Sequence, residues 1–344
     1  LLCDMYTLDK SPWAADPRSR LRSFLDDLPV VPQAAFESEF YLAERGDAGL
    51  VPLDTSGCFT ADGMQHAHPV MLETVDALKA QDMGIATYYP EYGPGQQELV
   101  IDHTAGLRPA DEYTLYKRTV KAVAAAHDLE ALFVPKPFRD QPGSGCHVHL
   151  SLWDDGENAF DDPSAEGAYG LSDLARHFIG GLIDHAPALL ALTAPTPLSY
   201  KRLQPDMWAS AYTCWGYDNR EAMIRIPSAD WTDPSASTRI EFKPVDNTVN
   251  PYLVLLGLLA AGWDGVEHEC DPGPPVERNP SELAPQERAD RGIDRYPRTL
   301  GEAIERLAED SVLEAALGAL VYEPYLDIKR ELWRQFISSV TDWE

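Results

Sequence analysis

Two glutamates in the stretch from Phe36 to Leu42 are spaced for metal chemistry. Because side chains alternate across a β-strand, an extended backbone places Glu37, Glu39 and Tyr41 on one face and the apolar residues on the other. Carboxylates about 7 Å apart along one strand face can each bind a different member of a pair of metal ions. On this stretch alone, the simpler interpretation is an edge strand with a solvated face.

Later stretches repeat this arrangement of polar side chains. A turn rich in Gly and Pro separates two glutamates and leads into an apolar strand, and two further predicted strands, at 146–152 and 238–243, each carry polar residues at alternate positions. The residues on these polar faces are Glu91, Glu98, His147, His149, Ser151, Arg239, Glu241 and Lys243. A fourth strand is predicted at 223–226, and it contains Arg225.

Convergence of these glutamates with His147 requires a counter-charge, which divalent cations supply most directly. Oxygen ligands with one imidazole favour Mg²⁺ or Mn²⁺ over zinc. Guanidinium groups suit phosphate oxygens, and the candidates are Arg202, Arg220, Arg225 and Arg239. Enzymes that transfer phosphoryl groups typically use metal ions together with arginine side chains. The alternatives are a structural histidine at His147 and a surface ion pair at Arg202.

Several helices must position these strands. Helix starts are predicted at Asp16-Pro17, His68-Pro69, Pro109, Ser172 and Asn250-Pro251. The last of these helices is apolar nearly all round, which predicts a buried position. Capping boxes are predicted at Thr299-x-x-Glu302 and Ser311-x-x-Glu314, a short strand at Cys3 to Tyr6, and an extended surface loop at 268–297. These elements predict an α+β fold whose sheet packs on helices by its apolar face.

Composition excludes several classes of protein. The chain has 344 residues, 44% of them hydrophobic, and 28 Lys and Arg against 56 Asp and Glu leave a net charge of −28. This balance argues against nucleic acid or an anionic membrane as a partner. The longest apolar run, 252–263, is too short to cross a bilayer. Five scattered cysteines predict free thiols and a cytoplasmic location. Nucleotide-binding motifs rich in glycine, H-E-x-x-H and G-x-S-x-G are missing from the sequence.

An ordered series of motifs resembles the glutamine synthetase superfamily, type I-like, along essentially the whole chain. The motifs are Phe36-Glu-Ser-Glu-Phe, Glu91 through Glu98, Lys136-Pro137 followed by Gly143-Ser-Gly-Cys-His-Val-His, Ser199-Tyr-Lys-Arg202, Asn219-Arg220 through Arg225-Ile-Pro, and Arg239-Ile-Glu-Phe-Lys243 ahead of Asn250-Pro-Tyr. The resemblance implies a curved antiparallel sheet with helices packed outside. Residues 1–15 resemble the tail of the family's N-terminal β-grasp domain, which is otherwise largely missing, and residues 16–344 resemble its catalytic domain.

The same resemblance implies an ATP-dependent ligase. In this family the γ-carboxylate of glutamate attacks ATP, and an amine then displaces phosphate from γ-glutamyl phosphate. One of two or more Mg²⁺ or Mn²⁺ ions would be held by Glu39, Glu91 and Glu98, and another by Glu37, His147 and Glu241. The residues matched to glutamate are Arg202 and Gly143, those matched to phosphates are Arg220 and Arg225, and those matched to the nucleotide are His149, Ser151 and Arg239.

Departures from the family pattern concern the amine. Ammonia-using members carry a glutamate six residues after the arginine that matches Arg202, where this chain has Trp208. Lys243 stands at a position where the family usually has arginine. Pro142 stands at a position where ammonia-using members often have asparagine. Trp208, with Tyr212, Trp215 and Tyr217 nearby in sequence, predicts an aromatic-lined amine pocket, because an alkylated cation can lie on an aromatic face. We therefore assign Arg202, Arg220 and Trp208 to catalysis, and Lys243 to substrate binding.

The expected activity is a γ-glutamyl–amine ligase, closest in pattern to relatives that glutamylate polyamines, ethanolamine or other organic amines. The family implies a homo-oligomeric ring, a dodecamer, in which a neighbour's N-terminal domain completes each site. Two alternatives stay open. One is a glutamine synthetase with an altered ammonia site, and the other is a catalytically silent paralogue that acts as an amine sensor or structural ring.

Overall fold

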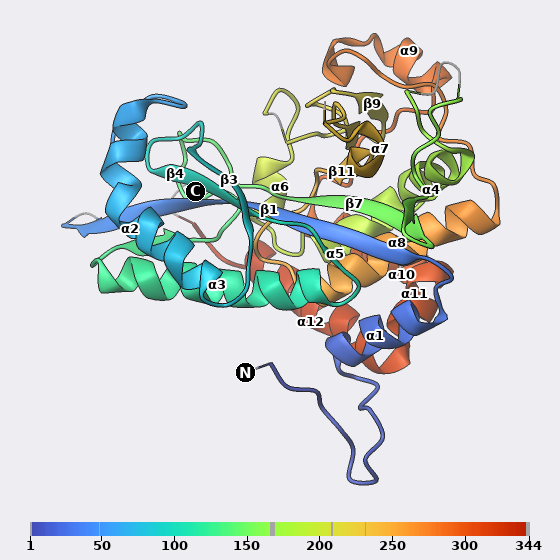
Figure 1. The fold of residues 1–344 in the computed structure, drawn as a ribbon, viewed down its shortest axis with the longest axis horizontal. Helices are drawn as coiled ribbons and strands as arrows, with labels where there is room; N and C mark the ends of the chain where they lie inside the picture. The colour runs from blue at the N-terminus through green and yellow to red at the C-terminus, as the bar shows by residue number, and fades with distance from the viewer. Residues whose placement is uncertain (1, 48, 166–168, 208, 231, 342–344) are drawn as a thin grey trace.

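The computed structural model describes residues 2–47, 49–165, 169–207, 209–230 and 232–341 of the chain. Within them lies one sheet of eleven strands (Figure 1). The strands are β1 (Val31–Gly46), β2 (Gly49–Pro52), β3 (Ile85–Pro90), β4 (Gln96–Ile101), β5 (Thr104–Ala105), β6 (Glu130–Leu132), β7 (Cys146–Asp154), β8 (Glu157–Asn158), β9 (Trp215–Tyr217), β10 (Ile224–Ile226) and β11 (Ile240–Phe242). The α-helices are α1 (Pro17–Asp27), α2 (Ala61–Lys79), α3 (Arg108–Ala126), α4 (Asp173–Asp184), α5 (Ala186–Thr193), α6 (Ser199–Arg202), α7 (Pro234–Ser237), α8 (Pro251–Glu267), α9 (Pro285–Asp290), α10 (Leu300–Ala308), α11 (Ser311–Leu317) and α12 (Ala319–Ile337).

The long strand β1 organises the sheet. It pairs antiparallel with β4 on one side and with β7 on the other, in the strand order β3-β4-β1-β7-β11-β10-β9. Every pair along this path is antiparallel except β9 with β10, which is parallel. The predicted α+β fold with a mainly antiparallel sheet is therefore confirmed. The short strand expected at Cys3 to Tyr6 is wrong, because only an isolated bridge joins Tyr6 to Pro12.

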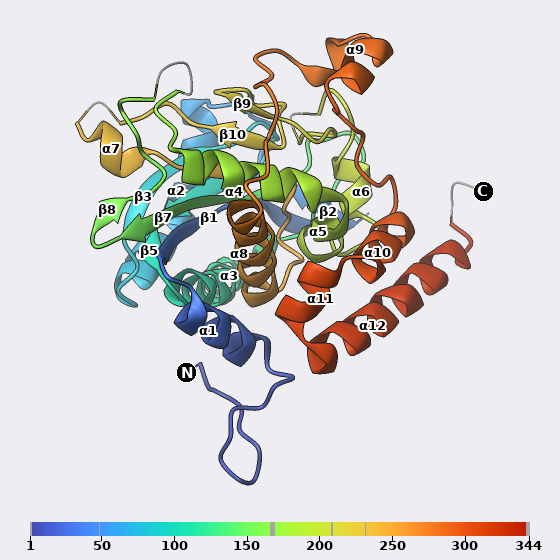
Figure 2. The same ribbon diagram turned by 90° about the vertical axis from the view of Figure 1, so that its right-hand side faces the viewer.

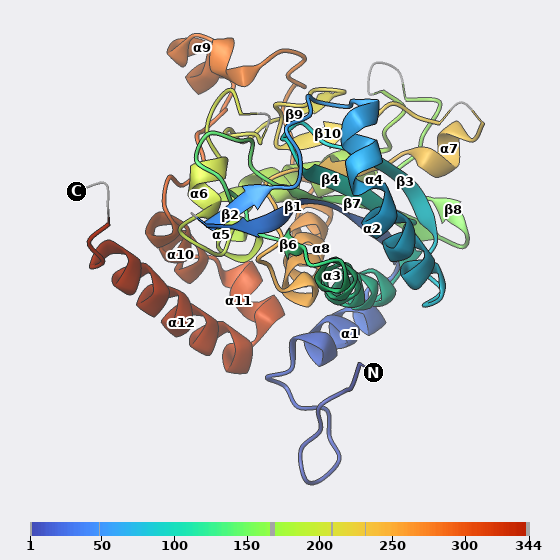
Figure 3. The same cartoon turned by 90° about the vertical axis from the view of Figure 1, so that its left-hand side faces the viewer.

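The apolar face of the sheet packs on helices, as the alternation of residues predicts. Phe36 of β1 stacks on Tyr113 of α3 with ring centroids 4.6 Å apart, and Phe40 stacks on Phe133 at 5.0 Å. Figures 2 and 3 show α1, α3, α8 and α10–α12 gathered on one side of the sheet, with α7 and α9 on the other. The polar face is therefore left free of the helices that form the main core.

Helix starts follow side-chain caps. Asp16 accepts hydrogen bonds from Arg18 N and Ser19 N at the start of α1, as predicted. The start expected at His68-Pro69 is wrong, because α2 begins at Ala61 under a Thr60 cap and contains Pro69 in its interior. Asp310, not Ser311, caps α11 by accepting from Val312 N and Leu313 N. An aspartate one position earlier supplies a better-placed acceptor than the serine.

Helix α8 is buried, as predicted, and packs closely against α4. A Cβ added to Gly181 would lie 2.2 Å from Ala261 O, so the two helix backbones meet where only glycine fits. The region 268–297 is not simply a surface loop. It contains a 3₁₀ turn at Pro280–Glu282 and helix α9, and its Val276, Leu283 and Ile293 are buried in a second, small apolar cluster.

Two further expectations concern the chain as a whole. All five cysteines are free thiols. Among the described helices, none is both long enough and apolar enough to cross a membrane.

Candidate active site

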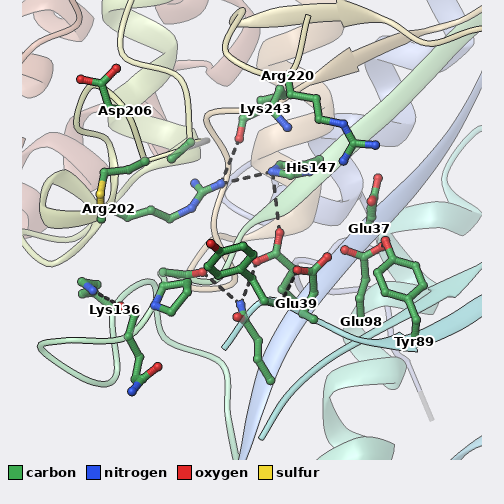
Figure 4. Close-up of a pocket in the computed structure, with 18 of the residues that line it drawn as sticks. Glu37, Glu39, Tyr89, Glu98, Lys136, His147, Arg202, Asp206, Arg220 and Lys243 are labelled. Carbon is green, nitrogen blue, oxygen red and sulfur yellow. Dashed lines mark hydrogen bonds and ion pairs between the residues drawn. The ribbon is translucent and has the colours of Figure 1, made fainter. Parts of the chain in front are cut away.

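The polar face of the sheet forms one wall of a cavity of about 570 Å³ (Figure 4). Most of the predicted site residues line it. These are Glu37, Glu39, Glu91, Glu98, Gly143, His147, Arg202, Arg220, Arg225, Glu241 and Lys243. Residues that lie far apart in the sequence therefore meet in one space.

Strand register explains how the carboxylates and imidazoles converge. In the antiparallel pair of β1 with β4, Glu39 is directly opposite Glu98. In the pair of β1 with β7, Glu37 is opposite His147, and in the pair of β7 with β11, His149 is opposite Glu241. Each strand contributes one or two polar side chains to the same face, so the cluster follows directly from alternation and pairing.

At the β4 end, three carboxylates crowd together. Glu39 Oε2 accepts from Gly145 N at 3.0 Å, Tyr89 donates to Glu98, and Glu91 Oε2 accepts from Tyr92 N at 2.7 Å. Burial and the charge of Glu39 raise the pKa of Glu91 to about 7. Burial and the charge of Glu37 raise the pKa of Glu98 well above its usual range. Within the described part of the chain, no arginine or lysine forms an ion pair with these three carboxylates.

At the β11 end, positive groups compensate the carboxylates. Glu241 is 2% exposed, and His147 Nδ1, Lys243 Nζ and Arg225 Nη1 lie 3.0, 3.2 and 2.9 Å from its oxygens. Burial raises its pKa, but the charge of Lys243 and the hydrogen bond from His147 outweigh this effect and hold the pKa well below its usual range.

Glu37 lies beside this group and contacts the second imidazole. His149 Nε2 lies 2.5 Å from Glu37 Oε2, and Arg239 Nε donates to His149 Nδ1 at 3.2 Å. Burial raises the pKa of Glu37, and the hydrogen bond and charge of His149 more than offset this and lower it to about 2. The donation from Arg239 leaves the Nε2 hydrogen of His149 directed at the carboxylate.

The donor set fits divalent cations. Glu37, His149 and Glu241 each offer one ligand atom, and these atoms lie within 4.8 Å of one another. The prediction named His147 for this group, whereas His149 completes the group found in the described part of the chain. His147 Nε2 lies 4.0 Å from Glu39 Oε1. Oxygen-rich ligands and uncompensated carboxylates match the chemistry of Mg²⁺ or Mn²⁺. The assignment of the two imidazoles stays a prediction.

Arginines lie beside the carboxylates. Arg202 is buried, and its Nη1 donates to Val245 O at 3.0 Å while its Nη2 lies 3.3 Å from His147 Nε2. Arg225 Nη2 donates to Asp218 at 3.0 Å, and its Nε is buried without a hydrogen-bond partner. Fixed guanidinium groups beside a carboxylate cluster can bind anionic substrates without reorganising.

Comparison with known proteins identifies the family to which the chain belongs. The family model described as "Glutamine synthetase, catalytic domain" matches residues 14–344. The chain belongs to the glutamine synthetase family. The glutamine synthetases of Methanocaldococcus jannaschii and Thermus thermophilus are each 39% identical to it, over all of this chain and 76% and 77% of their own lengths.

Solved structures support the same family. A structure titled "GmaS/ADP complex-Conformation 1" is 32% identical, superposes with a TM-score of 0.86, and covers 98% of this chain and 77% of its own. A structure titled as a novel glutamine synthase homolog gives a TM-score of 0.85 over 98% of this chain and 75% of its own, also at 32% identity. The resemblance and the fold are confirmed, and the protein is a ligase of nitrogen metabolism from a family that uses ATP, glutamate and divalent metals.

Three residues predicted for the nucleotide side of this glutamine synthetase-family site do not line the cavity. They are His149, Ser151 and Arg239. The Ser151 hydroxyl accepts from Trp153 Nε1 at 2.9 Å, and Arg239 Nη1 donates to Ser237 O at 2.9 Å. His149 and Ser151 lie farther along β7, and Arg239 lies directly before β11. Their role in nucleotide binding stays a prediction.

The expected aromatic pocket is partly wrong. Trp208 lies outside the described residues, although its neighbours Met207 and Ala209 line the cavity. Tyr212 and Trp215 are buried in the core, and Tyr217 stacks on Tyr169 away from the cavity. Among the described residues, the aromatic side chains that do line the cavity are Phe59, Tyr89 and Tyr92.

Sequence reasoning missed several residues of the site. Gln96 lines the cavity two positions before Glu98 on the same strand face, so alternation alone could have found it. Asp206 and the loop residue Arg139 also line the cavity, and no local pattern marked them, whereas Lys136, which lines it too, belongs to a motif of the family resemblance. Their positions depend on tertiary packing of loops.

Proposed function

We propose that this chain carries the catalytic site of an ATP-dependent ligase that joins the γ-carboxyl group of glutamate to an organic amine. The observation that supports it is the meeting of five glutamates, an imidazole and four arginines in one cavity. Such a cavity suits a reaction that transfers phosphate from ATP to an anionic amino acid bound beside the ATP. Residues 16–344 are proposed as the catalytic domain and residues 1–15 as the tail of a preceding domain.

The proposed metal ligands are divided between the two ends of the cluster. Glu39, Glu91 and Glu98 would hold one ion, and Glu37, His147 and Glu241 the other, with His149 as an alternative to His147. When bound, Mg²⁺ or Mn²⁺ would neutralise charge on the transferred phosphate. All six proposed ligands line the cavity, which argues against a catalytically silent paralogue.

Cationic side chains are proposed to hold the anionic substrates. Arg202, fixed by Val245 O, and Gly143 would bind glutamate, and Lys243 lies buried in the same wall. Arg220 and Arg225 would steady phosphates, and Arg225 keeps a buried N–H without a partner. His149, Ser151 and Arg239 would line the nucleotide side.

The preference for an organic amine rests on Trp208. An ammonium ion needs a carboxylate at the position where ammonia-using relatives place glutamate, whereas an indole can hold an alkylated cation on its face. Apolar surface is available in the cavity, because Phe59, Tyr92 and Met207 line it and are exposed. Such surface favours a substrate with carbon atoms to bury.

A second candidate is a glutamine synthetase that uses ammonia. It is favoured by the curated relatives at 36% to 39% identity, which are named glutamine synthetases. It is also favoured by Asp206, a carboxylate that lines the cavity two residues before Trp208. Asp206 could attract ammonium in place of the missing glutamate.

We also propose a cytoplasmic ring of identical subunits, expected from the family as a dodecamer. The N-terminal segment projects away from the body of the subunit (Figure 1), with Tyr6 and Leu8 exposed, and is anchored where Asp4 pairs with Arg18 and Arg22. Free thiols at all five cysteines suit a reducing compartment.

The test is phosphate release from ATP in the presence of glutamate, with a panel of amines and with ammonium as control. The proposal predicts that release depends on glutamate, on Mg²⁺ or Mn²⁺ and on an added amine, and that mass spectrometry detects the matching γ-glutamyl amide. Release with ammonium alone would support the second candidate. Absence of any amide product under all these conditions would contradict both.

A further inference from the structure

A buried carboxamide connects three segments that meet beneath the cavity. Gln96, at the start of β4, is 1% exposed. Its Nε2 donates to Glu39 Oε2 and to Gly143 O, both at 3.0 Å, and its Oε1 accepts from Gly93 N at 2.9 Å. One side chain therefore joins strand β1, the loop before β7 and the turn between β3 and β4.

Only a carboxamide satisfies these partners. Glu39 and the Gly143 carbonyl are acceptors and need a donor, whereas the Gly93 N–H needs an acceptor. A glutamate carboxylate offers no donor, methionine offers no N–H, and asparagine is one methylene shorter. The position therefore selects glutamine for its hydrogen bonds and not for its volume alone.

The surrounding backbone is anchored without Gln96. Asn247 Nδ2, on the opposite face, donates to Glu39 O at 2.7 Å and to Gly145 O at 3.2 Å. Tyr41 Oη donates to Pro142 O at 2.9 Å. Loss of the Gln96 amide would leave these anchors in place, so its effect should fall on the Glu39 carboxylate and the Gly143 carbonyl.

We infer that Gln96 is a positioning residue that couples the metal-binding carboxylate of Glu39 to the glutamate-binding loop at Gly143; this inference rests on the proposed function. Glu39 Oε2 accepts from both Gln96 Nε2 and Gly145 N, and the same Nε2 group holds Gly143 O. A shift of Glu39 on binding an ion therefore reaches the loop through one shared amide. Because linkage is reciprocal, glutamate should also strengthen binding of the ion.

The test compares wild-type protein with Gln96→Met, which keeps the chain length but removes both donor and acceptor. Gln335→Met on α12, outside the cavity, is the matched control. Titration calorimetry with Mn²⁺, in the presence and absence of glutamate, measures the coupling. Hydrogen exchange of the Gly145 amide reports directly on the bond to Glu39, and steady-state kinetics give KM for glutamate and for ATP.

The expected result for Gln96→Met is weaker coupling, faster exchange at Gly145 and a KM for glutamate raised about 10-fold or more, because a hydrogen bond to a charged group is lost. KM for ATP should change less than about twofold. The Gln335→Met control should match wild type in every measurement.

A folded Gln96→Met protein with unchanged coupling, Gly145 exchange and glutamate KM would overturn the inference. If this variant does not fold, Gln96→Leu, which also removes the donor and the acceptor and adds no charge beside Glu39, gives the same comparison. Equal losses in both KM values with a lower Tm would mean that Gln96 has a structural role only. The calorimetry and exchange need no turnover, so failure of every amine to react would count against the proposed function and not against this test.

Discussion

Glu39 and Glu98 lie directly opposite each other across the antiparallel pair of β1 and β4. Like charges at such a position destabilise a sheet unless another group compensates them. The raised pKa of Glu98, caused by burial and then by the charge of Glu37, has the same physical origin. As proposed metal ligands, these carboxylates should reduce the stability of the metal-free protein and should supply the affinity for a divalent ion.

A metal-dependent reversal of stability should follow from this arrangement. A carboxyl group whose pKa is raised in the folded state costs stability as the pH rises above its unfolded value of about 4.5. At neutral pH in chelator, Glu98→Gln should therefore raise Tm by about 2–4 °C. In excess Mn²⁺ the Tm of the variant should lie below that of wild type, and the variant should lose most ligase activity. Thermal unfolding in both conditions, with Glu44→Gln at the exposed end of β1 as control, checks this, and a variant less stable than wild type in chelator would contradict it.

His185 should make stability depend on pH. Its Nδ1 lies 2.7 Å from Asp310, the cap of α11, and its Nε2 lies 3.2 Å from Asp264 of α8, which also pairs with His268. Burial lowers the pKa of His185, but the hydrogen bonds and charges of Asp310 and Asp264 outweigh this and raise it. The stabilisation is therefore complete below about pH 6.5 and is lost as the pH rises through the higher pKa of the folded state.

Urea unfolding between pH 5.5 and 9 should show this dependence. The free energy of unfolding should exceed that of His185→Gln most at low pH, and the difference should shrink as the pH rises. The side chain of His268 is 67% exposed, so His268→Gln should change the free energy of unfolding much less. A difference that grows with pH would show that the sign argued for His185 is wrong.

Much of the site could be predicted from local rules. Alternation placed Glu37 with Glu39 and His147 with His149, and the register of β1 with its neighbours then brought these pairs together. Helix starts at Asp16 and Asn250 followed from cap chemistry. These features depend on a few neighbouring residues, which a sequence displays directly.

Other features depend on long-range packing. Pro69 indicated a helix start but lies inside α2, because Thr60 provides an earlier cap. Tyr212 and Trp215 were expected in an amine pocket but are buried. Trp215 lies on β9, which joins the end of the sheet beside β10, and Tyr212 packs in the small second apolar cluster. The three partners of Gln96 come from separate segments, so no local pattern could identify its role.

Assembly can be measured independently of chemistry. If, as proposed, a neighbouring subunit completes the active site, protein that includes the proposed N-terminal domain should form a large ring and should be more active per subunit than residues 16–344 alone. Light scattering coupled to size-exclusion chromatography, with activity measured on the same fractions, tests this. A fully active monomer would rule out the ring.

Trp208 should control the choice of amine. Trp208→Glu should shift preference toward ammonium, because a carboxylate can attract the ion and accept its proton. Trp208→Ala should weaken use of the organic amine by about 0.5–2 kcal/mol in transition-state binding, the range of a cation–π contact. Trp215→Phe, at a buried position away from the cavity, serves as control. The test measures kcat/KM for ammonium and for the best organic amine in wild type and in each variant. A ratio of these two values that is unchanged in both Trp208 variants would count against this role.

The most direct test of the proposed function is a competition between ammonium and the best organic amine in one reaction. Wild-type protein with ATP, glutamate and Mn²⁺ receives equal concentrations of both, and mass spectrometry measures the ratio of γ-glutamyl amide to glutamine at early times. This ratio equals the ratio of the two kcat/KM values. An organic amine substrate predicts an excess of the γ-glutamyl amide, whereas an excess of glutamine would contradict the proposal and identify an ammonia-using glutamine synthetase.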